Sequence, residues 1–397
     1  MLNPKTSERE LCYLVTIDDV IPHNNADRLE IAIVGGWHCI VGKDEFKKGD
    51  IGVYFEIDSL LPEKEPFKSM EFLASKHFKI KTQKIRGELS QGFLVHVNTF
   101  IGTEFNEISE MTFYNDENRF LTEKLQVKYN DPADNEIKSS SGNIQKVDKY
   151  RRMNSRHKEL FSHQPFRFLM RHDLGKWLLF LFFGHRNDSK KANWPYYVRK
   201  TDEERIQNMK WILENKNPWL ATEKIDGSSL TVAYKPEGKD SGIFICSRNL
   251  AHFESDNNPY TRVAKKYNIP DALKDICKKY NLEYVVFQGE MYGQNVQKRD
   301  YGLKEIKVAG FNLIFSGKGR LNSVVSENIM AEYGIPWVPI LNTRYILPDT
   351  VEELLDYAES ETSKIDGGLR EGIVFRSPDG SKSFKAVSNK FLLKYHS

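Results

Sequence analysis

The sequence lacks the cysteine patterns and the long apolar runs that mark disulfide-rich, zinc-binding or membrane-spanning proteins. Its four cysteines are scattered over 397 residues without a CxxC spacing, so we expect neither disulfides nor a structural zinc site. The longest apolar run, WLLFLFFG at 177–184, is far shorter than the ~20 residues of a membrane-spanning helix. The first residues also lack a basic-then-apolar signal pattern. We therefore expect a cytoplasmic protein that has no membrane partner.

The chain also lacks a strong net charge, but the charge that it has is unevenly distributed. The formal net charge is +3. Residues 136–200 contain 15 lysines and arginines against 5 acidic residues, a local balance of +10 that leaves −7 for the rest of the chain. Such a basic block on a near-neutral protein indicates a polyanionic partner, and a solvated linker is the alternative interpretation.

Short strand-like stretches predict a small β-barrel in the N-terminal part of the chain. Over residues 9–60 these stretches are separated by turns that contain Gly, Asn or Asp, a spacing typical of a barrel rather than of alternating strands and helices. The predicted turns lie at 23–25, 35–36 and 48–50. We expect 77–97 to continue the barrel as a strand, with Lys79 and Lys81 on one of its faces.

Strands and helices mix in the C-terminal part, which predicts a second and larger α+β domain. A polar stretch at 131–146 marks the boundary, helical pieces follow near 157–183, and a helix with Thr201 as its N-cap is predicted at 201–216. Strands are predicted at 219–225, 229–235, 242–247, 284–291, 306–315 and 371–376, and helices near 261–280, 324–333 and 351–360. The predicted division of the chain is 1–130, 131–193 and 194–397.

The tetrapeptide KIDG occurs twice, at 224–227 and at 364–367. A lysine two residues before Asp-Gly can present a nucleophilic amine to a nucleotide phosphate, but such a sequence is more often only a turn. Only 33 residues follow Lys364, too few to build a nucleotide pocket, and the second copy fits the turn between a helix and a strand. We therefore expect Lys364 to be structural and Lys224 to be the reactive lysine.

Residues suited to nucleotide chemistry follow Lys224 in order. The set comprises Lys224, Asp226, Arg248, Glu290, Phe311, Glu371 and Lys385. The three acids can hold metal-bound water against phosphates. Arg248 can bind ribose or phosphate, Lys385 can neutralise charge on the α-phosphate, and Phe311 can stack on a base. Attack by the lysine requires a neutral amine, so we expect its pKa to be lowered. Each residue alone has a structural explanation, and it is their order that favours chemistry.

This ordered set resembles the covalent nucleotidyltransferases, the superfamily of polynucleotide ligases and RNA capping enzymes. The phrases TEKIDGSSL, KTDEERIQN, GWHCIVGKDEFKKGDIGVYFEIDSLLP and FKIKTQKIRGELSQGFL are similar to ATP-dependent RNA ligases of the fifth RNA ligase family. The resemblance covers roughly 9–125 and 194–395. It implies an α+β fold in which an OB-like β-barrel precedes a nucleotidyltransferase domain of antiparallel sheets with flanking helices. DNA ligases and capping enzymes of standard layout place the OB domain last and are disfavoured.

The resemblance implies an ATP-dependent RNA ligase that acts in RNA repair. ATP would adenylylate Lys224, AMP would move to a 5′-phosphate RNA end, and a 3′-hydroxyl would expel it. A divalent metal, Mg²⁺ or Mn²⁺, is implied at Asp226, Glu290 and Glu371. The implied catalytic residues are Lys224, Asp226, Glu290, Glu371 and Lys385. The implied nucleotide contacts are Glu223, Lys224, Gly227, Arg248, Glu290, Phe311, Lys385 and Arg205. We expect a monomer that binds a nicked duplex or a broken RNA strand.

Some features depart from the family pattern or leave alternatives open. The last motif usually carries two lysines one residue apart, and here Val387 takes the second place. Lys382 or Lys390 could supply the missing charge. The segment from Lys200 to Arg205, expected near the triphosphate, could instead only cap the helix at 201–216. The alternative functions are a non-catalytic OB-fold protein that binds nucleic acid and a ligase that acts mainly on DNA ends.

The basic block generates a first prediction. If it binds the RNA backbone together with the basic residues of 77–97, each lost phosphate contact lowers the log–log salt slope of binding by about 0.7–0.9. Replacing Arg151, Arg152, Arg156 and Lys158 by Ala should weaken RNA binding, flatten that slope and leave adenylylation by ATP unchanged. RNA binding measured against salt concentration checks this. Unchanged affinity and slope would make the block a solvated linker.

Overall fold

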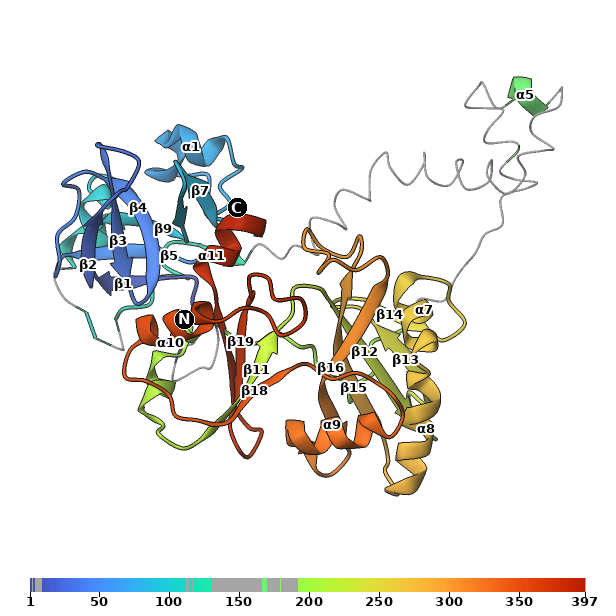
Figure 1. The fold of residues 1–397 in the computed structure, drawn as a ribbon. Helices are drawn as coiled ribbons and strands as arrows, with labels where there is room; N and C mark the ends of the chain where they lie inside the picture. Colours follow the sequence, from blue (N-terminus) through green and yellow to red (C-terminus); the bar gives the residue numbers. More distant parts are fainter. Residues whose placement is uncertain are drawn as a thin grey trace. The chain divides into compact units, whose positions relative to one another are not determined.

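The computed structural model describes residues 1, 3, 9–111, 114–115, 118–129, 166–169, 179 and 192–396 (Figure 1). The chain separates into one compact unit of Met1–Tyr129 with Ala192–Ser397 and a second of Asn130–Lys191. The second unit contains α5 (Phe166–Leu169). The remaining helical pieces predicted near 157–183, and nearly all of the basic block, lie outside the described residues. No helix in the described ranges is long and apolar enough to cross a membrane.

The N-terminal part of the first unit is built from small antiparallel sheets, as predicted. One sheet contains β1 (Cys12–Thr16), β5 (Ile51–Phe55) and β9 (Phe93–His96), and another contains β2 (Asp19–Pro22), β3 (Leu29–Val34) and β4 (Trp37–Gly42). Two strand pairs, β6 (Ser59–Leu60) with β10 (Lys128–Tyr129) and β7 (Gln83–Ile85) with β8 (Glu88–Ser90), and α1 (Glu71–Ala74) complete it.

Strand β1 shows why this part has two cores. Successive side chains of a strand point to opposite faces of its sheet. Tyr13 and Val15 pack into the core shared with β3 and β4. Cys12 and Leu14 pack on the other face, against the helical turns that follow β6 and β9. All four side chains are buried, which explains an apolar run where an exposed strand would alternate.

The single strand predicted over 77–97 is wrong. His77 and Phe78 have φ of +53° and +58°, so the chain is irregular before β7, and Lys79 and Lys81 lie in that irregular stretch. Gly92, with φ of +95°, then separates β8 from β9. The predicted alternation in burial is nevertheless present, because Phe78 and Ile80 are buried. The turn predicted at 35–36 is confirmed between β3 and β4.

The C-terminal part contains two antiparallel sheets. The larger has the order β14-β13-β12-β15-β16-β17 and the smaller the order β18-β11-β19-β20 (Figure 1). Their bounds are β11 (Trp219–Lys224), β12 (Ser228–Lys235), β13 (Gly242–Cys246), β14 (Ala251–Phe253), β15 (Val285–Gly293), β16 (Ile306–Phe315), β17 (Gly319–Arg320), β18 (Ile340–Tyr345), β19 (Gly372–Arg376) and β20 (Ser383–Val387). The six predicted strands are confirmed.

Helices cover the outer faces of both sheets. The larger sheet packs against α7 (Pro259–Lys266), α8 (Ile269–Lys279) and α9 (Ser323–Ala331), and the smaller against α10 (Val351–Ser360). The short α11 (Asn389–Phe391) follows β20. The helices predicted near 324–333 and 351–360 are confirmed as α9 and α10, and Asn268, with φ of +52°, divides the one predicted near 261–280 into α7 and α8.

The helix predicted at 201–216 is wrong. Two short 3-10 turns, Ile206–Asn208 and Lys210–Glu214, stand in its place. The preceding residues run beside β20 instead, because the Lys385 N–H donates a 2.7 Å hydrogen bond to the Glu204 carbonyl. Ile206, Met209 and Ile212 still enter the core under α10, so the apolar spacing indicated burial but not helix. The alternative in which Lys200 to Arg205 only cap this helix is therefore excluded.

Candidate active site

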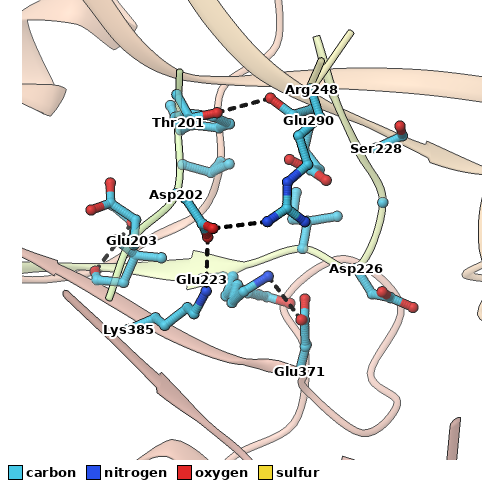
Figure 2. Close-up of a pocket in the computed structure, with 18 of the residues that line it drawn as sticks. Thr201, Asp202, Glu203, Glu223, Asp226, Ser228, Arg248, Glu290, Glu371 and Lys385 are labelled. Carbon is cyan, nitrogen blue, oxygen red and sulfur yellow. Dashed lines mark hydrogen bonds and ion pairs between the residues drawn. The ribbon is translucent and has the colours of Figure 1, made fainter. Parts of the chain in front are cut away.

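A cavity of about 330 Å³ lies between the two sheets of the C-terminal part (Figure 2). The smaller sheet contributes β11, β19 and β20 to its walls, and the larger contributes β12, β15 and β16. Of the residues predicted from the sequence, the cavity brings together Glu223, Lys224, Asp226, Gly227, Arg248, Glu290, Phe311, Glu371 and Lys385.

The pleat of the smaller sheet sorts its side chains between cavity and core. Lys224 is paired with Gly372, and Thr222 with Val374, which is in turn paired with Lys385. Paired positions in neighbouring strands point to the same face, so Thr222, Lys224 and Lys385 share the cavity face. The alternate positions Ala221, Ile373, Phe375, Phe384 and Ala386 pack under α10. The face of the smaller sheet that packs into the apolar core thus fixes the position of the polar face that lines the cavity.

Lys224 is ion-paired inside the cavity. Its Nζ lies 2.8 Å from Oε1 of Glu371. Burial lowers the pKa of Lys224, but the carboxylates of Glu371, Glu290 and Asp226 outweigh burial and raise that pKa above its ordinary value. The predicted lowering of its pKa is therefore wrong for the protein groups alone, because three acids stabilise the ammonium form.

The acidic side chains around Lys224 lie close enough together to influence one another's ionisation. Burial, assisted by the charges of Glu371 and Asp226, raises the pKa of Glu290 to about 8, although Lys224 and Arg248 oppose the shift. Oε2 of Glu371 is buried and has no hydrogen-bond partner among the described residues. No three His, Cys, Asp or Glu side chains in the described ranges are placed to ligate one metal ion directly.

Two cations in the cavity share one carboxylate. Asp202 accepts from Nη2 of Arg248 at 2.8 Å and from Nζ of Lys385 at 3.2 Å (Figure 2). Burial opposes ionisation of Asp202, but these two partners lower its pKa overall. Burial also lowers the pKa of Lys385, and Asp202 opposes that shift. The pair of cations marks a position at which an anionic group is held.

Arg376 lines the cavity as well, and sequence reasoning missed it. Burial lowers its pKa to about 10, with partial compensation by Glu203. Its Nη1 donates to Thr222 Oγ1 at 3.0 Å, and its guanidinium lies 5.9 Å from the centre of the Phe311 ring. The sequence EGIVFR could have indicated it, because Arg376 lies two residues beyond Val374 and therefore on the same face of β19. Asp202 belongs to the segment from Lys200 to Arg205 that was expected near the triphosphate, and Thr201, Asp202 and Glu203 of that segment line the cavity.

Two predicted contacts differ from the rest. Arg205 does not line the cavity in the part of the chain that the structure describes, and its guanidinium lies 5.5 Å from the ring centre of Trp37 in the N-terminal part. Glu223 does line it but is only 2% exposed, and both its carboxylate oxygens accept hydrogen bonds from Ser363 and Lys364.

The departure at Val387 has a structural explanation. Its side chain is buried together with Leu392 and with Leu89 of β8, so this position joins the two parts of the first unit. Neither candidate substitute for the missing lysine lines the cavity. Lys382 lies over the Trp211 ring at 4.8 Å, and Lys390 pairs with Glu359 at 3.3 Å.

The glycines of the two KIDG copies are required for different reasons. A Cβ at Gly227 would lie 2.1 Å from the Met291 carbonyl oxygen of β15, so only glycine lets the first copy pack against the larger sheet. Gly367 has nothing within 4 Å of such a Cβ but a φ of +71°, which a turn favours. The second copy is the turn between α10 and β19, as predicted.

Comparison with known proteins agrees with this architecture. An OB-fold domain model matches residues 11–97, and an RNA ligase model matches residues 217–396. Comparison with curated protein sequences gives no match.

Solved structures of an RNA ligase from Naegleria gruberi match nearly the whole chain. The structure with PPi has a TM-score of 0.65 and 26% identity, over 98% of this chain and 99% of that one. A mutant with AMP and Mn has a TM-score of 0.66 and 26% identity, over 98% and 99%. A mutant with ATP and Mn has a TM-score of 0.65 and 26% identity, over 98% and 100%. The chain therefore combines an N-terminal OB-fold domain with a C-terminal domain of the RNA ligase family, as its sequence predicts.

Proposed function

We propose that the protein is an ATP-dependent RNA ligase that joins 3′-hydroxyl and 5′-phosphate ends through AMP bound covalently to Lys224. This proposal rests on the position of the Lys224 amine, which lies 2.8 Å from Glu371 inside the cavity of an RNA ligase domain. This lysine lies within the cavity, whereas Lys364 of the second copy is 55% exposed and pairs with Glu361.

The cavity offers separate places for the base and the phosphates of ATP. Phe311 provides an aromatic face at one wall, and aromatic side chains bind flat rings by stacking. Arg248 and Lys385 provide two cations that already share an anion. A phosphate oxygen can replace the Asp202 carboxylate as their partner, and Lys385 then neutralises charge on the phosphate under attack. The ligase structures with ATP, AMP and PPi support this assignment.

A divalent cation fits the acidic side of the cavity. The unpartnered Oε2 of Glu371 and the raised pKa of Glu290 indicate carboxylates that lack sufficient positive charge nearby. Asp226, Glu290 and Glu371 would hold Mg²⁺ or Mn²⁺ through its water. Such an ion would offset the negative charge that now stabilises the Lys224 ammonium, and so favour the neutral amine. The Naegleria structures with Mn support a divalent metal.

Several finer assignments belong to the same proposal. We take 1–130 as the OB-fold domain, 131–193 as a basic linker and 194–397 as the nucleotidyltransferase domain. The OB-fold domain and the basic linker would bind RNA, with the chain acting as a monomer. Four cysteines without a disulfide support a reducing, cytoplasmic location.

The choice between the two lysines is tested by substitution. Lys224→Ala should abolish formation of the covalent AMP adduct, because no other amine occupies its place in the cavity among the described residues. Lys364→Ala is the matched control and should label like the wild type. Labelling with α-³²P-ATP followed by denaturing gel electrophoresis measures both. Loss of labelling in a folded Lys364→Ala protein alone would contradict the assignment.

The role of Glu371 is tested against a second acid. Glu371→Gln keeps the shape but removes a charge, so adenylylation should slow by orders of magnitude, on the scale of about 3–4 kcal/mol for a key electrostatic group. Glu361→Gln is the control, because Glu361 pairs with Lys364 at 3.2 Å as Glu371 pairs with Lys224. Single-turnover adduct formation gives both rates. Equal rates in the two variants would make Glu371 structural.

The raised pKa of Glu290 predicts proton release when metal binds. At pH 7, below a folded-state pKa of about 8, this carboxyl is mostly protonated, and an ion favours its ionised form. Calorimetry of Mn²⁺ binding in buffers of different ionisation enthalpy should show release near one proton at pH 7, falling as the pH rises above 8. Glu290→Gln should reduce the release, and the surface variant Glu305→Gln should keep it. Binding without release in the wild type would contradict the shift.

A further inference from the structure

The turn that contains the second KIDG copy is closed by its own hydrogen bonds. The Ser363 N–H donates to the Gly368 carbonyl at 2.8 Å, and the Gly367 N–H donates to the Ser363 carbonyl at 2.9 Å. Asp366 accepts from the Gly368 N–H at 3.0 Å. Because these bonds lie within six residues, the turn is a rigid unit rather than an open connection.

This turn binds the side chain of Glu223, the residue immediately before Lys224. Ser363 donates its hydroxyl to Oε1 of Glu223 at 2.5 Å, and the backbone N–H of Lys364 donates to Oε2 at 2.8 Å. The Glu223 N–H donates in turn to the Pro339 carbonyl at 2.9 Å. A buried carboxylate that accepts several hydrogen bonds is fixed in position. The second KIDG copy therefore holds the end of the strand that carries the first.

Arg299 ties this turn to the other side of Lys224. Its guanidinium is 4% exposed, donates to Asp366 at 2.6 Å and lies 4.1 Å from the ring centre of Tyr301. The Tyr301 hydroxyl accepts the backbone N–H of Asp226 at 2.7 Å. One buried arginine thus supports two anchors, one on Glu223 and one on Asp226, and Lys224 lies between them.

We propose that Arg299, Tyr301 and the turn at 363–368 form a positioning frame that sets where the Lys224 amine lies during adenylylation. This inference rests on the proposed function. The frame residues act through Glu223 and Asp226 and do not themselves react. Attack on phosphorus needs the amine at the right distance and direction, and a displacement of 1 Å can cost about 100-fold in rate. Two anchors on either side of one residue are suited to prevent such a displacement.

The two anchors are tested by two small changes in the full chain. Ser363→Ala removes one donor to Glu223, and Tyr301→Phe removes the acceptor of the Asp226 N–H. Each should lower the single-turnover rate of adduct formation at saturating ATP and Mn²⁺ by about tenfold or more. The ATP concentration at half-maximal rate should change less than about twofold, because the phosphate and base contacts are intact. Glu361→Gln is the control and should keep the wild-type rate, because its half-exposed carboxylate pairs with the Lys364 side chain and lies outside the turn at 363–368.

A double variant separates positioning from general packing. If Ser363 acts through Glu223, then Ser363→Ala should cause little further loss in a Glu223→Ala background, which lacks the acceptor oxygens. Thermal unfolding of every variant shows whether it is folded, and Tyr301→Phe tests the frame even if Ser363→Ala unfolds. Wild-type rates in both single variants, or a full additional loss in the double variant, would overturn the frame alone. Absence of any adduct in the wild type would overturn the proposed function and the frame with it.

Discussion

The ion pair between Lys224 and Glu371 joins the two strands on which the site is built. Lys224 ends β11 and Glu371 directly precedes β19, and these strands pair from Leu220–Arg376 to Lys224–Gly372. Buried ion pairs add little net stability, because desolvation offsets the attraction. The register of β11 against β19 is instead secured by the apolar face of the sheet, which packs under α10. The sheet is therefore stabilised by one face and displays its chemistry on the other.

The same acids that hold Lys224 protonated also explain why a cation belongs in the cavity. Glu371, Glu290 and Asp226 raise the pKa of Lys224, and the mutual repulsion of the acids contributes to the raised pKa of Glu290. Negative charge thus exceeds what one ammonium can neutralise. In the same cavity, Arg248 and Lys385 share Asp202. The cavity thus contains a group of acids around the Lys224 amine and a pair of cations that already bind one carboxylate.

Much of the fold and of the candidate site could be predicted from the sequence, and the features that could not be predicted have physical reasons. The order of residues after Lys224 identified most of the cavity. Lys224 ends β11 and Glu371 directly precedes β19, whereas Glu290, Phe311 and Lys385 lie within strands whose apolar neighbours marked them in the sequence. The helix predicted at 201–216 is wrong because a tertiary contact with β20 overrode a helical pattern. The pairing of Asp202 with Arg248 and Lys385 and the hydrogen bonds to Glu223 could not be predicted, since these contacts join residues far apart in the chain. Arg376 could have been found by applying the strand alternation to EGIVFR.

We propose Lys224, held by the second KIDG copy, as the residue that receives AMP. Peptide mapping by tandem mass spectrometry of the protein incubated with ATP and Mn²⁺ tests it most directly. We expect AMP on the peptide that contains Lys224, bonded to that side chain, and none on the peptide that contains Lys364. AMP on Lys364, or on no lysine of a folded protein, would contradict it.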